Sequence, residues 1–225
     1  MQISHRSKFL LIHIQRTGGG SVARALKPWI DHPKAGRAAK VASLLPFTRD
    51  PRQLFFGAHI KAREVKLRWP RKAWEEYFKF CFVRNPYSWL VSLYSRIGSS
   101  PEHRQFNRVS TMSFPEYVDW ELARNRRHQH HFVCDRAGQV ILDFVGRLES
   151  LDADVATVFR RLGLEAPAAI PKLGGRQHAP WQSFYDNATR AKVAAHWSRD
   201  LELFGYDFEG PRTDLHAAVG MLAGK

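Results

Sequence analysis

Apolar residues along this chain gather in short runs that glycine, proline and charged residues separate. Two continuous runs, Phe9 to Ile14 and Phe78 to Val83, predict strands that are buried on both faces. Two weaker runs, Leu54 to His59 and Val140 to Leu148, predict two further short strands. The pattern therefore indicates a small sheet whose strands come from most of the chain.

Other apolar positions recur at helical spacing. Val22 to Trp29 carries apolar residues at i, i+3, i+4 and i+7, and Pro28 helps to end that helix. Asn85 is the expected N-cap of a second helix, because Pro86 suits the first helical position. Further helices are expected over 113–125, over 155–162, and from an N-cap at Asp186 to about His196.

The order of strand, glycine-rich loop and helix over residues 9–29 is typical of the start of a parallel α/β domain. We therefore expect an α/β fold, with a single P-loop-like domain whose central parallel sheet is flanked by helices. This domain is predicted to span residues 1–209, and residues 210–225 are predicted to form a weakly ordered C-terminal tail. The length of 225 residues suits one domain with a sizeable core.

The chain carries a large excess of positive charge, with 35 Lys and Arg against 21 Asp and Glu and a formal net charge of +14. Such an excess favours anionic partners: nucleotides, sulfated or carboxylated sugars, nucleic acid or an acidic membrane surface. With 44% hydrophobic and 25% charged residues, the composition is globular and argues against a disordered or membrane-embedded chain. Charge alone does not choose among these partners.

Two cysteines, Cys81 and Cys134, lie in apolar surroundings, which predicts buried free thiols. Neither their number nor their spacing points to an oxidising compartment. The longest apolar run near the N-terminus, Phe9 to Ile12, is too short for a secretory signal. No stretch approaches the roughly 20 apolar residues of a membrane helix. We expect a cytoplasmic protein with no membrane span.

Three consecutive glycines stand between the first predicted strand and the first predicted helix. Glycines let backbone N–H groups approach a ligand closely, and a helix N-terminus favours negative charge. The loop therefore fits a phosphate cradle, although a turn that only packs a helix on a sheet is the simpler alternative. It is not a Walker A loop, because no lysine follows the last glycine, nor is it G-x-G-x-x-G. The donors of this cradle would come from Arg16, Thr17, Gly18, Gly19, Gly20 and Ser21.

A second segment, Val83 to Tyr94, has an arginine at the end of a strand and a serine two helical turns further on. Arg84 leaves the strand beside a helix N-terminus, and Ser92 faces roughly the same side. A guanidinium and a hydroxyl in this arrangement can bind one phosphate, the guanidinium as a planar fork. Taken alone, Arg84 could equally be a structural arginine.

Together the two segments resemble the PAPS-dependent sulfotransferases, in particular the carbohydrate and hexuronic-acid 2-O-sulfotransferases, over most of residues 8–208. Their phosphosulfate loop, H-I-P-K-T-G-G-T-S, is similar to His13-Ile14-Gln15-Arg16-Thr17-Gly18-Gly19-Gly20-Ser21. The resemblance implies in-line transfer of the sulfuryl group of PAPS (3′-phosphoadenosine-5′-phosphosulfate) to a hydroxyl, with PAP as the other product. It also implies that the loop binds the 5′-phosphosulfate and that Arg84 and Ser92 bind the 3′-phosphate.

The resemblance further assigns catalytic roles. The family lysine that contacts the bridging oxygen of the leaving phosphate is Arg16 here, which keeps the charge but cannot transfer a proton. Gly57-Ala58-His59 falls, with an offset of one residue, where relatives carry a catalytic histidine, so His59 is the expected general base. Glu149 is the alternative base, and a structural histidine at a strand end is the simpler interpretation of His59.

Two basic runs, 61–72 and 124–131, follow the predicted base His59 in the sequence. They are expected to line an acceptor groove for an anionic glycan, and a solvated basic surface is the alternative. Arg176 and His178 are expected to close over the nucleotide.

No metal is expected, because no carboxylate or cysteine has the spacing from His128, His130 and His131 that would complete a site. Two other classes of protein were considered. A P-loop nucleotide kinase would need Gly-Lys-Ser/Thr and a Walker B aspartate, and both are missing. A basic nucleic-acid-binding module would need a helix-turn-helix, zinc or RNP pattern, which is also missing. The expected partner is thus a carbohydrate or other hydroxylated acceptor, whose identity the sequence leaves open together with the oligomeric state.

Overall fold

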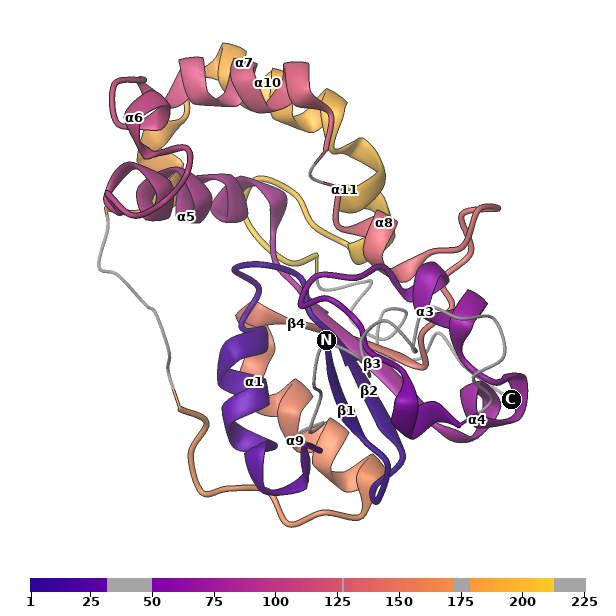
Figure 1. Cartoon of the computed structure of the whole chain (residues 1–225). Coiled ribbons are helices and arrows are strands. Elements are labelled where there is room, and N and C mark those ends of the chain that lie inside the picture. The colour runs from indigo at the N-terminus through magenta and orange to yellow at the C-terminus, as the bar shows by residue number, and fades with distance from the viewer. Residues whose placement is uncertain (32–49, 127, 172–178, 213–225) are drawn as a thin grey trace.

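A four-stranded sheet, counted over the described residues 1–31, 50–126, 128–171 and 179–212, lies at the centre of this computed structural model (Figure 1). Its strands are β1 (Gln2–Ser4), β2 (Phe9–Ile12), β3 (Phe78–Val83) and β4 (Phe144–Arg147), in that spatial order. The last three strands are parallel, whereas β1 pairs with β2 antiparallel. The predicted α/β class is confirmed, but the expectation of a purely parallel sheet is wrong. The edge strand β1 is too short and too polar to stand out in the sequence pattern.

The sheet is buried on both faces because its side chains alternate between two hydrophobic cores. In β2, Phe9 and Leu11 lie in one core, and Leu10 and Ile12 lie in the other. The first face is covered by α1 (Gly19–Ala25) and α9 (Leu151–Leu162) (Figure 1).

The second face carries a larger group of helices. α5 (Pro86–Gly98) follows β3 directly and packs against α7 (Phe114–Arg124) and α10 (Asn187–His196), above the sheet in Figure 1. Lys192 of α10 and Asp119 of α7 form an ion pair of 2.6 Å that joins these two helices. Within the described residues, the other α-helices are α3 (Ala62–Arg68), α4 (Arg71–Glu76), α6 (Phe106–Val109), α8 (His130–Val133) and α11 (Ser198–Phe204).

Two helix starts agree with the predicted capping residues. The Asn85 side chain accepts a hydrogen bond from Tyr87 N at 3.0 Å, with Pro86 at the first helical position. The Asp186 side chain accepts from Thr189 N at 2.6 Å. Each cap satisfies a backbone donor that the first turn of a helix leaves unpaired.

Two predicted strands differ in the structure. Residues 54–57 are irregular and Ala58 and His59 form a turn, so no strand forms at 54–59. Phe56 packs on Trp69 instead, with ring centroids 5.8 Å apart. The run 140–148 forms a strand only at Phe144–Arg147, while Val140 makes an isolated bridge with Cys134. Leu54 and Leu142 are buried and their apolar neighbours Phe55, Phe56, Val140 and Ile141 are half-buried, but a strand also needs a hydrogen-bonded neighbour.

The C-terminal part of the described chain folds back on itself. Pro211 bridges to Tyr206, and Arg212 N donates to Gly205 O at 2.8 Å. Residues 213–225 of the predicted tail lie outside the described residues, as do Arg176 and His178. Both cysteines are buried free thiols, as predicted. Among the described residues, none of the helices has the length and apolar character needed to cross a bilayer.

Candidate active site

The glycine-rich loop joins the end of β2 to the start of α1, and its backbone takes two left-handed positions. Arg16 has a φ of 62° and Gly18 a φ of 84°. A left-handed φ is uncommon outside glycine, and such strained positions cluster at functional sites. Gly19 is required for another reason, since a Cβ there would lie 2.5 Å from the His13 ring. At Gly20, where the sulfotransferase loop has threonine, a Cβ would meet nothing within 4 Å.

The two hydroxyl residues of the loop are both buried. Thr17 Oγ1 donates to the Ile14 carbonyl oxygen at 3.0 Å, which closes the loop on itself. This hydroxyl therefore supports the loop from within. Ser21 lies in the first turn of α1, where its side chain is also enclosed.

The second predicted motif meets this loop in space. Arg16 Nε donates to Ser92 Oγ at 3.1 Å, and Arg84 Nη1 lies 3.5 Å from the Arg16 carbonyl oxygen. Arg84 Nε donates to Ser88 Oγ at 2.8 Å. The structure thus pairs Ser92 with Arg16, and it places Ser88, one turn earlier on α5, against Arg84. Ser88 was not among the predicted site residues; its place in the first turn of the helix that follows Arg84 was the available signal.

The positively charged guanidinium groups of Arg16 and Arg84 therefore lie close together. Burial lowers the pKa of Arg84 to about 10, with Glu149 acting to raise it and Arg16 to lower it. Arg84 stays protonated at neutral pH because this pKa still lies well above 7. The two arginines and the neighbouring loop form a site suited to an anion with several charges, such as a phosphate.

The backbone of Arg84 is held by Gln129. Arg84 N donates to Gln129 Oε1 at 3.0 Å, and Gln129 Nε2 donates to the Arg84 carbonyl oxygen at 2.7 Å. Gln129 N in turn donates to Asp200 Oδ2 at 2.7 Å. This two-way amide contact fixes the point where the Arg84 side chain leaves β3. No sequence pattern indicated it, because the two residues lie 45 positions apart.

Glu149, the alternative base, connects three parts of the fold. Its carboxylate accepts from Asn85 N at 2.9 Å and from Tyr206 Oη at 2.7 Å. Burial, together with the Glu149 charge, raises the pKa of Tyr206 well above its ordinary value. Glu149 therefore links the exit of β4 to the start of α5 and to the C-terminal segment.

His59 reaches the loop from the turn at 58–59 and is exposed. Its Nδ1 lies 3.0 Å from the His13 carbonyl oxygen. A carbonyl oxygen only accepts hydrogen bonds, so Nδ1 carries the proton and Nε2 keeps its lone pair. Burial lowers the pKa of His13 to about 4, as does the positive charge of His59 whenever that ring is protonated, and this keeps His13 neutral. The structure thus places His59 beside the loop in the tautomer that a general base requires.

A cavity of about 310 Å³ opens next to the loop. Its lining includes Gln15 and Trp89, and Trp89 Nε1 donates to the Gln15 carbonyl oxygen at 2.6 Å. Arg104, Arg124 and Arg126 give the cavity its positive charge. The basic run at 124–131 thus contributes to this cavity, whereas the run at 61–72 does not line it.

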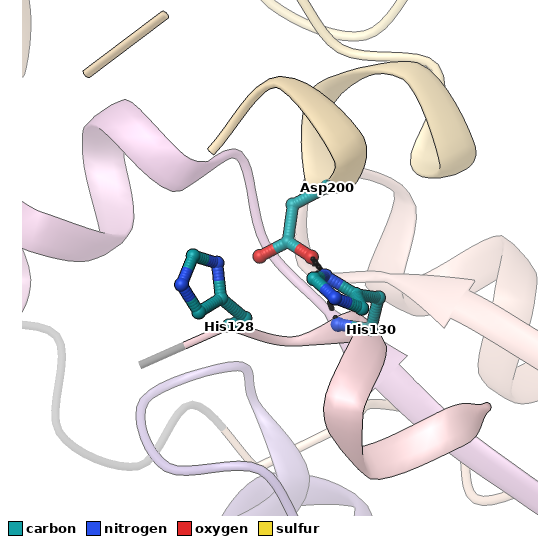
Figure 2. Close-up of side chains that lie close together, drawn as sticks. All are labelled: His128, His130 and Asp200. Atoms are coloured by element: carbon teal, nitrogen blue, oxygen red, sulfur yellow. Dashed lines mark hydrogen bonds and ion pairs between the residues drawn. The ribbon is translucent and has the colours of Figure 1, made fainter. Parts of the chain in front are cut away.

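The structure also places a carboxylate beside the histidines of the second basic run (Figure 2). Asp200 Oδ1 accepts from His130 Nδ1 at 2.6 Å, and His128 completes a group of three potential metal ligands. The expectation that no carboxylate joins these histidines is therefore wrong. Asp200 lies 70 residues from His130, so spacing along the chain could not reveal it.

An α/β fold in which a glycine-rich loop meets an arginine at a strand end is suited to binding phosphate or sulfate groups. The family model described as "Sulfotransferase family" matches residues 1–207, and the chain belongs to this family. The resemblance seen in the two sequence motifs is thereby confirmed.

Two curated relatives show how far the similarity extends. An uncharacterised protein of Archaeoglobus fulgidus is 30% identical over 101 residues, which cover 44% of this chain and 79% of that protein. Carbohydrate sulfotransferase 12 of Xenopus laevis is 24% identical over 171 residues, which cover 59% of this chain and 40% of that protein. No solved structure matches this chain significantly.

Proposed function

We propose that this chain transfers the sulfuryl group of PAPS to a hydroxyl of a carbohydrate, with His59 as the general base. The observation that carries the proposal is the meeting of the two phosphate-binding segments, in which Arg16 Nε donates to Ser92 Oγ across 76 positions of sequence. PAPS carries two anionic groups, and the site offers two separate cationic groups in Arg16 and Arg84. The glycine-rich loop serves as a P-loop-like cradle for the 5′-phosphosulfate.

In the proposed reaction, His59 Nε2 takes the proton of the acceptor hydroxyl while the oxygen of that hydroxyl forms a bond to sulfur. The bond between sulfur and the bridging phosphate oxygen breaks on the opposite side, and PAP leaves with the electron pair. Arg16 stabilises the charge that develops on the leaving phosphate, and Arg84 with Ser88 and Ser92 holds the 3′-phosphate. Most of the catalysis is then positioning and electrostatic stabilisation, because PAP is a good leaving group.

The cavity beside the loop supports an acidic carbohydrate as the acceptor. It borders Ile14 and Gln15, next along the chain to the His13 carbonyl that binds His59. Arg104 and Arg126 are both exposed at its lining, where they can meet carboxylate or sulfate groups. The similarity to a protein named a carbohydrate sulfotransferase supports the same class of acceptor.

Incubation with ³⁵S-labelled PAPS and a panel of acidic glycans, neutral glycans and small hydroxylated compounds tests this function. We expect label to move to an acidic glycan, with one PAP formed for each sulfate transferred. Formation of PAP without any labelled acceptor would show a hydrolase instead. ATP consumption in the same assay would favour a kinase.

Charge reversal at the cavity should affect the acceptor and spare the donor. In the double variant Arg104→Glu, Arg126→Glu, the KM for the acidic acceptor should rise about tenfold or more, since each exposed charge pair contributes up to about 1 kcal/mol. The KM for PAPS should stay nearly unchanged, and added salt should weaken acceptor capture in the unmodified protein. The double variant Lys66→Glu, Lys72→Glu is the matched control, because it changes the charge equally at exposed positions of the other run. An equal rise of the acceptor KM in the two double variants would show that the cavity is an ordinary basic surface and not an acceptor site.

A further inference from the structure

The histidine and aspartate group between α8 and α11 has the composition of a metal site. His128, His130 and Asp200 each offer one ligand atom, and these atoms lie within 4.8 Å of one another. His128 and Asp200 are buried and His130 is half-buried. Figure 2 shows one ring nitrogen of His128 facing the Asp200 carboxylate, while the other points away from it. The group lies outside the sulfuryl-transfer machinery described above.

The hydrogen bonds around His128 determine which of its nitrogens is free to bind a cation. Its Nε2 lies 2.8 Å from Asn125 Oδ1, an acceptor, so Nε2 carries the proton. Nδ1 therefore has a lone pair, and it is the nitrogen on the side of the carboxylate in Figure 2. A lone pair that faces a buried carboxylate is electrostatically unfavourable unless a cation lies between them.

Asp200 is held firmly and still has capacity for a cation. Its Oδ1 accepts from His130 N at 2.8 Å and from His130 Nδ1 at 2.6 Å, while its Oδ2 accepts from Gln129 N at 2.7 Å. A carboxylate oxygen can accept two hydrogen bonds or metal contacts, so Oδ2 can bind a cation without losing its backbone partner. This arrangement resembles the hydrogen-bonded ligands of preorganised metal sites.

We propose that His128, His130 and Asp200 bind one divalent transition-metal ion of the zinc type. Imidazole and carboxylate ligands in this number are those that zinc accepts, with a further position left for water or another donor. His196 is one source of such a donor: its ring centroid lies 4.8 Å from that of His128, and its Nε2 is buried with no hydrogen-bond partner among the described residues. Coordination by His130 Nδ1 would release the proton of its bond to Asp200 into solvent.

The position of this site indicates a structural role for the metal. The basic cavity is lined by residues on both sides of His128 and His130 in the sequence, namely Arg124, Arg126 and Phe132. Gln129, between His128 and His130, holds the backbone of Arg84. An ion bound to these histidines and to Asp200 of α11 would tie that segment to the body of the protein. The metal would therefore position the cavity wall without taking part in the sulfuryl transfer.

Titration of the full chain with Co²⁺, after removal of metals by EDTA, tests the proposal independently of enzyme activity. We expect one Co²⁺ per chain, visible ligand-field bands of an N/O-ligated ion, release of protons, and displacement of Co²⁺ by Zn²⁺. His128→Phe should weaken metal affinity about a hundredfold, because it keeps the ring volume and removes the nitrogen. His5→Phe is the matched control, since His5 is a half-buried histidine that bonds Tyr77.

Two outcomes would overturn the proposal. One is the lack of saturable Co²⁺ or Zn²⁺ binding in the unmodified chain, and the other is equal affinity in folded His128→Phe. If His128→Phe does not fold, the absorption spectrum of the Co²⁺-loaded unmodified protein distinguishes the ligands. Intense near-ultraviolet thiolate bands would assign the metal to Cys81 or Cys134 and contradict the histidine site, whereas a spectrum without them would support it.

Discussion

Replacement of His59 by alanine is expected to lower the rate of sulfuryl transfer by about 10²–10⁴, the usual contribution of a general base. PAP affinity should stay the same, because His59 meets the loop at His13, through the carbonyl oxygen at 3.0 Å and through its ring at 5.0 Å, whereas the two phosphates are assigned to Arg16 and Arg84. The measurement is the turnover of labelled PAPS at saturating acceptor, together with the Kd for PAP. A loss of both turnover and PAP binding would instead indicate that His59 merely supports the loop.

His5→Ala provides the control for this variant. His5 is a half-buried histidine whose Nδ1 lies 3.0 Å from Tyr77 Oη, and it belongs to no part of the proposed site. Its loss should leave the rate of transfer unchanged. Unaltered turnover in His59→Ala would move the role of base to another group, for which Glu149→Gln is the next variant to measure.

The Arg16→Ala variant should lose transfer by about 10²–10³, the usual effect of removing one group that stabilises developing charge. Arg16 is the loop cation, and its Nε donates to Ser92 Oγ at 3.1 Å. Arg16→Lys should support equal or faster transfer, because lysine restores the charge and matches the family loop. The measurement is single-turnover transfer from labelled PAPS.

Arg24→Ala is the control for Arg16→Ala, since Arg24 is an exposed arginine on α1, close to the loop in sequence. It should leave the transfer rate unchanged. Full activity of Arg16→Ala would remove Arg16 from the mechanism, and a slow Arg16→Lys would show that the guanidinium fork itself is needed.

The sequence allowed the parts of this protein that depend on local pattern to be predicted. The buried runs in β2 and β3, the caps at Asn85 and Asp186, and the glycine-rich loop all follow from neighbouring residues. The partner of Ser92 differs from the prediction: Ser92 was expected to bind a phosphate together with Arg84, whereas its hydroxyl accepts from Arg16 and it is Ser88 that lies against Arg84.

The remainder depends on contacts between distant segments. Gln129 holds Arg84 across 45 positions, and Asp200 reaches His130 across 70. Residues of such contacts look like ordinary polar residues in the sequence, because nothing nearby marks their partner. The predicted strand at 54–59 failed for a related reason: its apolar residues found a packing partner in Trp69 but no strand to pair with.

The proposed recognition of the 3′-phosphate by Arg84 would separate a sulfotransferase site from an ordinary nucleotide site. The most direct test is a calorimetric titration with PAP and with adenosine 5′-phosphate, which differs from PAP only by the missing 3′-phosphate. Hydrogen bonds to a charged group contribute about 1.5–3 kcal/mol, so PAP should bind about ten- to a hundredfold more tightly. Arg84→Ala should abolish this difference, whereas Arg96→Ala, which alters an exposed arginine of α5 that pairs with Glu102, should keep it. Equal affinity of the unmodified protein for the two nucleotides would contradict the account.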